Sequence, residues 1–343
     1  PMPQPMDDRV VFLIGSPRSG STLLARMLGA HSAIFAPPEP HLMTPLAHLG
    51  FFDARVERAP YDPVITQRGL QEFAKGLARG EEDVLEGLRA LTDTLYARAL
   101  ATQGRRLLLD KTPAYALVLP FLVRLYPAAR YVVLTRHPLA VWSSFVDSFF
   151  DGDFRAAHAH NPLLERYVPA VARLLREAPV PLVHVRYESL VAEPEPTLRR
   201  ICERLEVPFE PGMIDYGEQA PTTGRVARGL GDPVTVGRES RPTQGSLEKW
   251  KGALEADPER LGQAREILAR LTDPDLAAWG LDPQGLRAEL AALEPKGAGP
   301  SRSRLTRYAL ERRLLVRLRR NIHHNALGRM VRRVQTACDV LLR

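Results

Sequence analysis

The chain has few of the residues that would place it in several specialised classes of protein. Only two cysteines, Cys202 and Cys338, occur among its 343 residues, too few for a disulfide framework or a metal cluster. No uncharged apolar run approaches the roughly 18 residues of a membrane span. The first residues lack the pattern of a secretory signal peptide. We therefore expect a cytoplasmic protein with no transmembrane segment and no resident metal.

Positive charge is concentrated near the C-terminal end. The formal net charge is +7, but residues 301–343 contain twelve arginines and no lysine, against only Glu311 and Asp339. The remainder is slightly acidic, which argues against nucleic acid as a partner. Leu and Val at helical spacing predict a basic amphipathic tail over residues 304–343. Such a tail suits an acidic partner such as an acyl carrier protein, an anionic membrane surface, or simple packing with a solvated basic face.

Short apolar runs alternate with helical patterns along the chain. The strand-like runs lie at residues 10–14, 105–113, 129–138 and 180–190. Helical spacing follows the first three runs at residues 23–28, 117–125 and 139–150, and it precedes the fourth run at residues 163–176. This alternation predicts an α/β fold with a P-loop-like three-layer architecture, a mostly parallel central sheet flanked by helices. Charged residues follow the runs, so we expect ligands at the carboxyl edge of the sheet.

One domain is expected over residues 9–285, followed by a linker over 286–303 and then the tail. Within the domain, residues 51–104 are interpreted as a helical insertion able to cap the fold. Residues 216–247 are rich in Gly, Pro, Thr and Arg and are interpreted as a long loop. A helix is then expected to begin with Ser246 as its N-cap.

The stretch GSPRSGST, residues 15–22, has the glycine spacing of a phosphate-binding loop but lacks its lysine. A strand-like run precedes it and a helical pattern follows, the layout in which backbone N–H groups bind phosphate. Ser21 replaces the lysine, and the nearest cation is Arg18. The sequence shows no clear acidic residue to bind magnesium beside this loop. Asp110 is the candidate, but the positive charge of Lys111 directly after it would compete with the metal. We interpret the loop as holding one phosphate without magnesium; a turn that binds nothing is the alternative.

A second anion site is predicted by Arg136 and Ser144 in the stretch TRHPLAVWSSF. Arg136 ends a strand-like run, and Ser144 lies about two turns into the following helix. Together they can clamp a phosphate separate from the first. The alternative is an arginine paired with a local carboxylate and a serine buried by its own helix.

Four segments in this order resemble one enzyme family: GSPRSGSTLL, DKTP with Tyr115, RLYPAARYVVLTRHP with VWSS, and SLEKWK. They resemble the sulfotransferases that use 3′-phosphoadenosine-5′-phosphosulfate (PAPS), most closely a bacterial branch found alone or as domains of modular polyketide and peptide synthases. The resemblance covers most of residues 9–285. It implies transfer of a sulfuryl group to a hydroxyl of a small or carrier-tethered natural-product intermediate, with 3′,5′-ADP as the product.

The resemblance also implies donor-binding residues. The 5′-phosphosulfate end would be bound by the loop residues Arg18, Ser19, Gly20, Ser21 and Thr22. Arg136 and Ser144 match the residues that bind the 3′-phosphate. Arg238 and Arg241 of the long loop are candidates near that phosphate, with a solvated loop as the alternative. Ser246 and Lys249 match a signature near the donor.

Catalytic roles follow in the same way. Lys111 lies at the position of the family's cation, with Arg18 as the second candidate. The histidine base of the hormone-sulfating branch is absent, because Pro113 occupies its position. Other branches place a glutamate after the first helix, so Glu39 is the candidate base, with an exposed loop carboxylate as the alternative. His41 is its rival, although a structural role is favoured for that residue.

Two other functions stay open. One is a nucleotide kinase-like P-loop phosphotransferase, which the missing lysine disfavours. The other is a non-catalytic module of a synthase that binds only a nucleotide or a carrier, which Lys111 and Glu39 disfavour.

Overall fold

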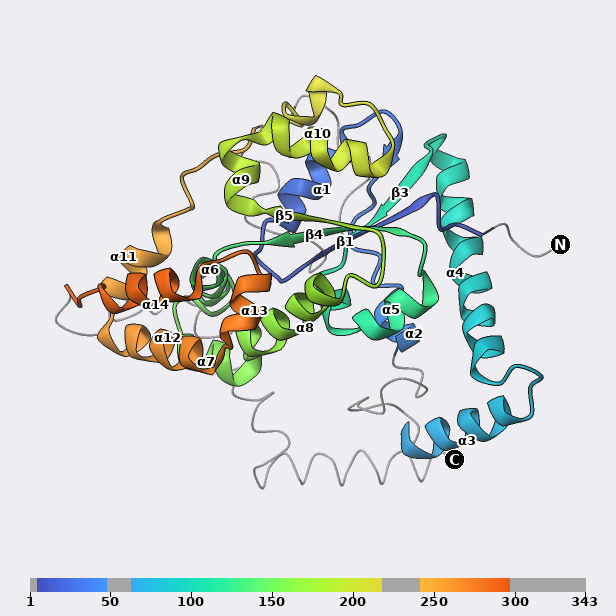
Figure 1. Ribbon diagram of the computed structural model, residues 1–343, viewed down its shortest axis with the longest axis horizontal. Coiled ribbons are helices and arrows are strands. Elements are labelled where there is room, and N and C mark those ends of the chain that lie inside the picture. Colours follow the sequence, from blue (N-terminus) through green and yellow to red (C-terminus); the bar gives the residue numbers. More distant parts are fainter. Residues whose placement is uncertain (1–4, 48–62, 218–240, 297–343) are drawn as a thin grey trace, which may run out of the picture.

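Five parallel strands form the centre of the computed structural model, which describes residues 5–47, 63–217 and 241–296 (Figure 1). The strand order is β2-β3-β1-β4-β5, and every neighbouring pair is parallel. The strands are β1 Val10–Gly15, β2 Ile34–Phe35, β3 Leu107–Asp110, β4 Arg130–Thr135 and β5 Leu182–Arg186. The predicted α/β fold with a parallel sheet is confirmed, and the two-residue strand β2 is an addition.

Both faces of the central strand β1 are apolar. Val10, Phe12 and Ile14 belong to one core cluster, whereas Val11 and Leu13 belong to another. A strand buried on both sides is what a parallel sheet covered by two helical layers requires.

Helices cover the two faces of the sheet (Figure 1). One face packs against α1 Ser21–Gly29, α9 Tyr187–Ala192, α10 Pro194–Leu205 and the 3-10 helix η2 Pro211–Met213. The helices that share a core cluster with the other face are α2 Met43–Ala47, α4 Glu81–Gln103, the 3-10 helix η1 Pro113–Leu117, α5 Leu119–Leu125, α6 Pro138–Phe150, α7 Phe154–His160, α8 Leu163–Glu177, α11 Lys249–Glu255, α12 Pro258–Arg270, α13 Asp273–Ala278 and α14 Pro283–Ala291. Among them, α7 contacts α6, α11 contacts α6 and α12, and α12 contacts α8 and α14. The remaining helix, α3 Pro63–Lys75, contacts α4.

The predicted helical insertion is helical, but α4 forms part of a layer. Tyr96 and Leu100 of α4 are buried in the core, and the Tyr96 hydroxyl donates to Asp110 at the end of β3. None of the described insertion residues lines the cavity at the carboxyl edge of the sheet. The described part of the insertion therefore supports the sheet and does not cover the site.

The folded part continues beyond residue 285, where the domain was expected to end and the linker to begin. Helix α14 extends to Ala291, and Leu290 and Leu293 are buried. These leucines belong to the same core cluster as helices α12 and α13, so the part of the domain that the structure describes includes α14.

The helix expected to begin at Ser246 begins at Lys249, and Ser246 does not cap it. The predictions for residues 218–240, which include Arg238, and for the tail over 304–343 lie outside the described residues. Across the described ranges, no helix combines the length and apolar character that a membrane span needs.

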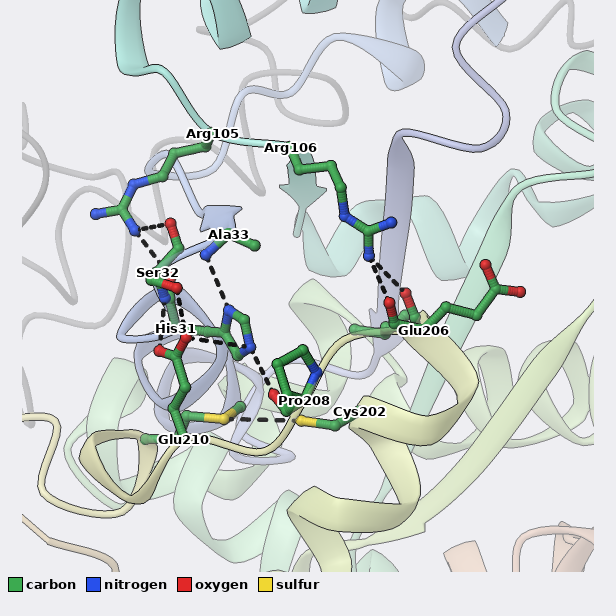
Figure 2. Close-up of polar contacts among 11 residues, drawn as sticks. His31, Ser32, Ala33, Arg105, Arg106, Cys202, Glu206, Pro208 and Glu210 are labelled. Atoms are coloured by element: carbon green, nitrogen blue, oxygen red, sulfur yellow. Dashed lines mark hydrogen bonds and ion pairs between the residues drawn. The ribbon is translucent and has the colours of Figure 1, made fainter.

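A polar cluster holds the turn between α1 and β2 against the segment that follows α10 (Figure 2). The Nε2 atom of buried His31 donates to the Pro208 carbonyl at 2.7 Å, and its Nδ1 accepts from the Ala33 N–H at 2.9 Å. Glu210 accepts from the Ser32 N–H at 2.7 Å and from the Ser32 hydroxyl. These bonds satisfy the polar groups after α1 and fix the C-terminal end of that helix.

Candidate active site

A cavity of about 620 Å³ lies at the carboxyl edge of the sheet. Segments that follow β1, β3, β4 and β5 contribute to its lining, as expected for a parallel sheet. Its volume lies within the range of cofactor sites. The predicted residues in the lining are Arg18, Gly20, Ser21, Thr22, Glu39, His41, Arg136, Ser144, Ser246 and Lys249.

The loop between β1 and α1 has the backbone of an anion site. Arg18 and Gly20 are both left-handed, with φ of 66° and 93°, and such a bend can direct successive N–H groups at one point. Helix α1 begins at Ser21 without a side-chain cap, which leaves its first N–H groups for a ligand. These N–H groups fit a phosphate group, whereas the Ser19 hydroxyl is fully buried and lies outside the cavity lining.

Gly20 is a position at which this loop tolerates no side chain. Its φ is +93°, and an added Cβ would lie 2.4 Å from Cδ2 of Tyr187. We expect Gly20→Ala to lower the free energy of unfolding by about 1–3 kcal/mol, measured by denaturant unfolding. Gly87→Ala is the control, because Gly87 lies in helix α4 with open space around it and alanine favours helix. Equal stability of the two variants would contradict this account.

Lys111 follows β3 and lies between the loop and Glu39. Its Nζ donates to Oε1 of Glu39 at 2.6 Å and to the Thr22 hydroxyl at 3.4 Å. The other carboxylate oxygen of Glu39 lies 3.3 Å from Nε2 of His41. The side chains of Lys111 and Glu39 are only 6% and 13% exposed, and charges act more strongly when shielded from water. The structure thus brings together the predicted cation and both candidate bases.

Arg136 and Ser144 approach the loop from β4 and α6. The two terminal nitrogens of Arg136 donate to the carbonyls of Arg18 at 3.1 Å and Ser246 at 3.0 Å. Its buried Nε has no partner within the described residues, and burial lowers the pKa of Arg136 because it disfavours the charged form. The Arg18 Nε donates to the Ser144 hydroxyl at 3.0 Å. The two predicted anion sites are therefore contiguous.

Tyr187 is part of this site although the sequence reasoning did not select it. Its ring lies 4.4 Å from the guanidinium carbon of Arg136, and its hydroxyl is 3.0 Å from the hydroxyl of Ser246. The same ring leaves no room for a Cβ at Gly20. The sequence contains only a weak indication of this position, because Tyr187 lies inside the strand-like run at residues 180–190, whereas in the structure it directly follows β5 at the carboxyl edge of the sheet.

Two further tyrosines, Tyr167 and Tyr216, line the cavity, and no local sequence pattern predicted that they would. The Tyr216 ring lies 4.5 Å from the guanidinium carbon of Arg26, which also lines the cavity. Tyr167 comes from α8, and burial raises its pKa to about 12, so its phenol stays protonated at neutral pH. Both positions depend on tertiary packing.

Lys111 does not itself line the cavity, although its partners Thr22 and Glu39 do, and several other residues considered from the sequence also lie outside it. Arg241 forms an ion pair with Asp215, and its side chain is 66% exposed. His137 stacks on Trp250 with ring centroids 4.5 Å apart, and burial lowers its pKa. Ser19 is buried behind the loop and does not line the cavity.

Asp110 does not have the position of a magnesium-binding acid. Its Oδ2 accepts hydrogen bonds from Tyr96 at 2.5 Å and Tyr115 at 3.1 Å, away from the cavity lining. Burial raises its pKa to about 7, and these two hydrogen bonds oppose the rise. Across the described ranges, no group of three His, Cys, Asp or Glu side chains is placed to hold a metal ion.

The chain belongs to the sulfotransferase family, whose profile matches residues 10–211. It is 31% identical over 264 residues to the nodulation protein NoeE of Sinorhizobium fredii, a match that covers 71% of this chain and 60% of that protein. It is 21% identical over 271 residues to protein-tyrosine sulfotransferase 1 of Danio rerio, covering 77% of this chain and 72% of that one. The chain therefore spans less than two thirds of NoeE.

A solved sulfotransferase domain from the curacin biosynthetic pathway shares the fold. It has a TM-score of 0.52 and 25% identity, over 84% of this chain and 99% of that domain. The family resemblance predicted from the four sequence segments is confirmed, and with it the P-loop-like α/β architecture.

Proposed function

We propose that the chain is a PAPS-dependent sulfotransferase that acts on a hydroxyl of a small or carrier-tethered natural-product intermediate. The observation that carries the proposal is the position of Lys111, 2.6 Å from Glu39 and 3.4 Å from Thr22. A cation and a base lie side by side next to an anion-binding loop, which is the set of groups that transfer of a charged sulfuryl group to a hydroxyl needs.

The donor would use the two contiguous anion sites. We assign its 5′-phosphosulfate to the N–H groups of residues 20–22 and the hydroxyls of Ser21 and Thr22, and its 3′-phosphate to Arg136 and Ser144. The Arg136 Nε, which has no partner within the described residues, supports this assignment, because a buried polar group without a partner is costly. Ser246 and Lys249 lie in the lining beside them.

The transfer needs one proton acceptor and a stabilised leaving group. The acceptor oxygen forms a bond to sulfur while the bond between sulfur and the 5′-phosphate oxygen breaks. Glu39 takes the proton of the acceptor hydroxyl, and Lys111 stabilises the negative charge that develops on the leaving oxygen. Thr22 and the helix N-terminus add hydrogen bonds to the same phosphate. Catalysis then comes from positioning and charge stabilisation, as in phosphoryl transfer.

The acceptor is assigned by class only. Phe149, Tyr167 and Ala140 give the cavity a partly apolar wall, which suits an organic acceptor better than a highly charged one. The similarity to a domain of the curacin pathway favours a natural-product intermediate. We would assay radiolabelled PAPS against phenols, simple alcohols and β-hydroxyacyl pantetheine thioesters.

Glu39→Gln is expected to lower kcat roughly 100-fold, because the amide keeps the shape of the side chain but cannot accept the proton. The donor KM should change little, since Glu39 is not one of the residues of the phosphate cradle, by which we mean the loop residues 20–22 together with Arg136 and Ser144. His41→Gln is the matched variant and should retain most of the activity. The reverse order of the two effects would identify His41 as the base.

Two outcomes would favour other functions. Turnover that requires magnesium and a nucleoside triphosphate would indicate a kinase-like phosphotransferase. Binding of 3′,5′-ADP without transfer to any acceptor of the panel would indicate a non-catalytic module. Label transferred to a hydroxyl without added metal would support the proposal.

A further inference from the structure

Glu39 and His41 lie on a short segment between β2 and α2 with an unusual backbone. The φ of His41 is 53°, in the left-handed region that residues with a Cβ adopt rarely. Such a conformation costs free energy and persists only where its surroundings hold it. The groups that hold this bend therefore also determine where Glu39 points.

Two buried hydroxyls hold the backbone at and after this bend. The His41 N–H donates to the Thr112 hydroxyl at 3.3 Å. The Met43 N–H donates to the Tyr115 hydroxyl at 3.2 Å. Both Thr112 and Tyr115 are fully buried, so water does not readily replace either contact. The segment is thus attached at two points to the chain that follows β3.

Tyr115 is itself fixed by the carboxylate at the end of β3. Its hydroxyl donates to Oδ2 of Asp110 at 3.1 Å, which directs its lone pairs to the Met43 N–H. Asp110 directly precedes Lys111. Residues 110–115 therefore hold both the proposed cation and, through two hydroxyls, the segment that carries the proposed base.

We propose that Thr112 and Tyr115 are positioning residues for sulfuryl transfer. They set the backbone of residues 39–43 so that the Glu39 carboxylate stays beside Lys111 and within reach of the acceptor hydroxyl. Neither residue contacts the reacting atoms. This inference rests on the proposed role of Glu39 as the base.

Tyr115→Phe tests the inference by removing one hydroxyl and keeping the ring. We expect its kcat to fall about tenfold with the donor KM within about twofold, because donor binding does not involve this segment. Tyr96→Phe is the matched control. It removes a hydroxyl from the same oxygen of Asp110, but the His41 and Met43 N–H groups bond to Thr112 and Tyr115 and not to Tyr96, and we expect its kcat to stay within about twofold.

Thr112 provides a second test in case Tyr115→Phe does not fold. Thr112→Val removes the acceptor of the His41 N–H and keeps the shape of the side chain, so its kcat should fall while the donor KM is retained. Thr112→Ser keeps the oxygen and should restore kcat. Equal kcat in the two variants would overturn the role of Thr112, since a merely structural effect would not follow the hydroxyl.

Amide hydrogen exchange separates this inference from the proposed function. Exchange at His41 and Met43 should be faster in Tyr115→Phe than in the wild type or in Tyr96→Phe. Unchanged exchange would overturn the positioning role whether or not the protein transfers a sulfuryl group. An active wild type with equal kcat in Tyr115→Phe and Tyr96→Phe would also overturn it and leave the proposed function intact. A wild type without transfer would contradict the proposed function and, with it, the catalytic purpose of the positioning, whereas the exchange rates would still show whether Tyr115 holds the backbone of residues 41–43.

Discussion

Lys111→Ala is expected to lower kcat for sulfuryl transfer about 1,000-fold and to change the donor KM less than about threefold. The ammonium is largely shielded from water, between Thr22 and Glu39, where a charge aimed at the leaving oxygen has its greatest effect. In the proposed site, ground-state binding of the donor would rely mainly on the loop and on Arg136. The loss should therefore fall on the transition state, measured as kcat with radiolabelled PAPS.

A matched lysine separates this effect from a general loss of charge. Lys251→Ala removes an equal charge from α11, where Lys251 pairs with Glu289 outside the cavity lining, and its kcat should stay close to that of the wild type. Lys111→Ala also leaves the Glu39 carboxylate without its cation, so thermal unfolding must be measured in parallel. A folded Lys111→Ala variant with near-normal kcat would remove Lys111 from the mechanism.

Arg136→Ala is expected to raise the donor KM about 100- to 1,000-fold, with a much smaller effect on kcat. A charge-assisted hydrogen bond to a phosphate contributes about 1.5–3 kcal/mol, and the loss of two bonds near the lower end of that range accounts for the expected change in KM. The Arg136 side chain also bridges the carbonyls of Arg18 and Ser246, so its loss loosens the cradle itself.

The contribution of the planar guanidinium group of Arg136 to donor binding can be measured separately from the contribution of its positive charge. Arg136→Lys keeps the positive charge but cannot make the planar contacts, so its donor KM should lie between those of the wild type and Arg136→Ala. Arg199→Ala is the control, because Arg199 is exposed on α10 and pairs with Glu195. An unchanged donor KM in Arg136→Ala would contradict the assignment of the 3′-phosphate site.

The fold was largely predictable because four of its five strands lie in short apolar runs of the sequence. The run at residues 10–14 became β1, and the end of that strand fixed the position of the loop. Strand β2 could not be found this way, since two residues are too short to show a period. The role of α4 was also missed, because whether a helix covers a sheet or a site depends on tertiary packing.

The site was predictable where each residue follows a strand. Lys111 and Arg136 come directly after β3 and β4, so a parallel sheet places both at one edge. The contacts that hold the segment of Glu39, the proposed base, were not predictable from the sequence. Met43 and Tyr115 are 72 positions apart in the chain, and no local pattern indicates that a tyrosine hydroxyl will accept from that backbone N–H.

The two-phosphate cradle is the central claim, and calorimetric titration without magnesium tests it most directly, because it needs no acceptor. We predict that 3′,5′-ADP binds the wild type at least about tenfold more tightly than 5′-AMP, since only the former reaches Arg136 and Ser144. Arg136→Ala should remove most of that difference. Equal affinities of the wild type for 3′,5′-ADP and 5′-AMP would contradict the account.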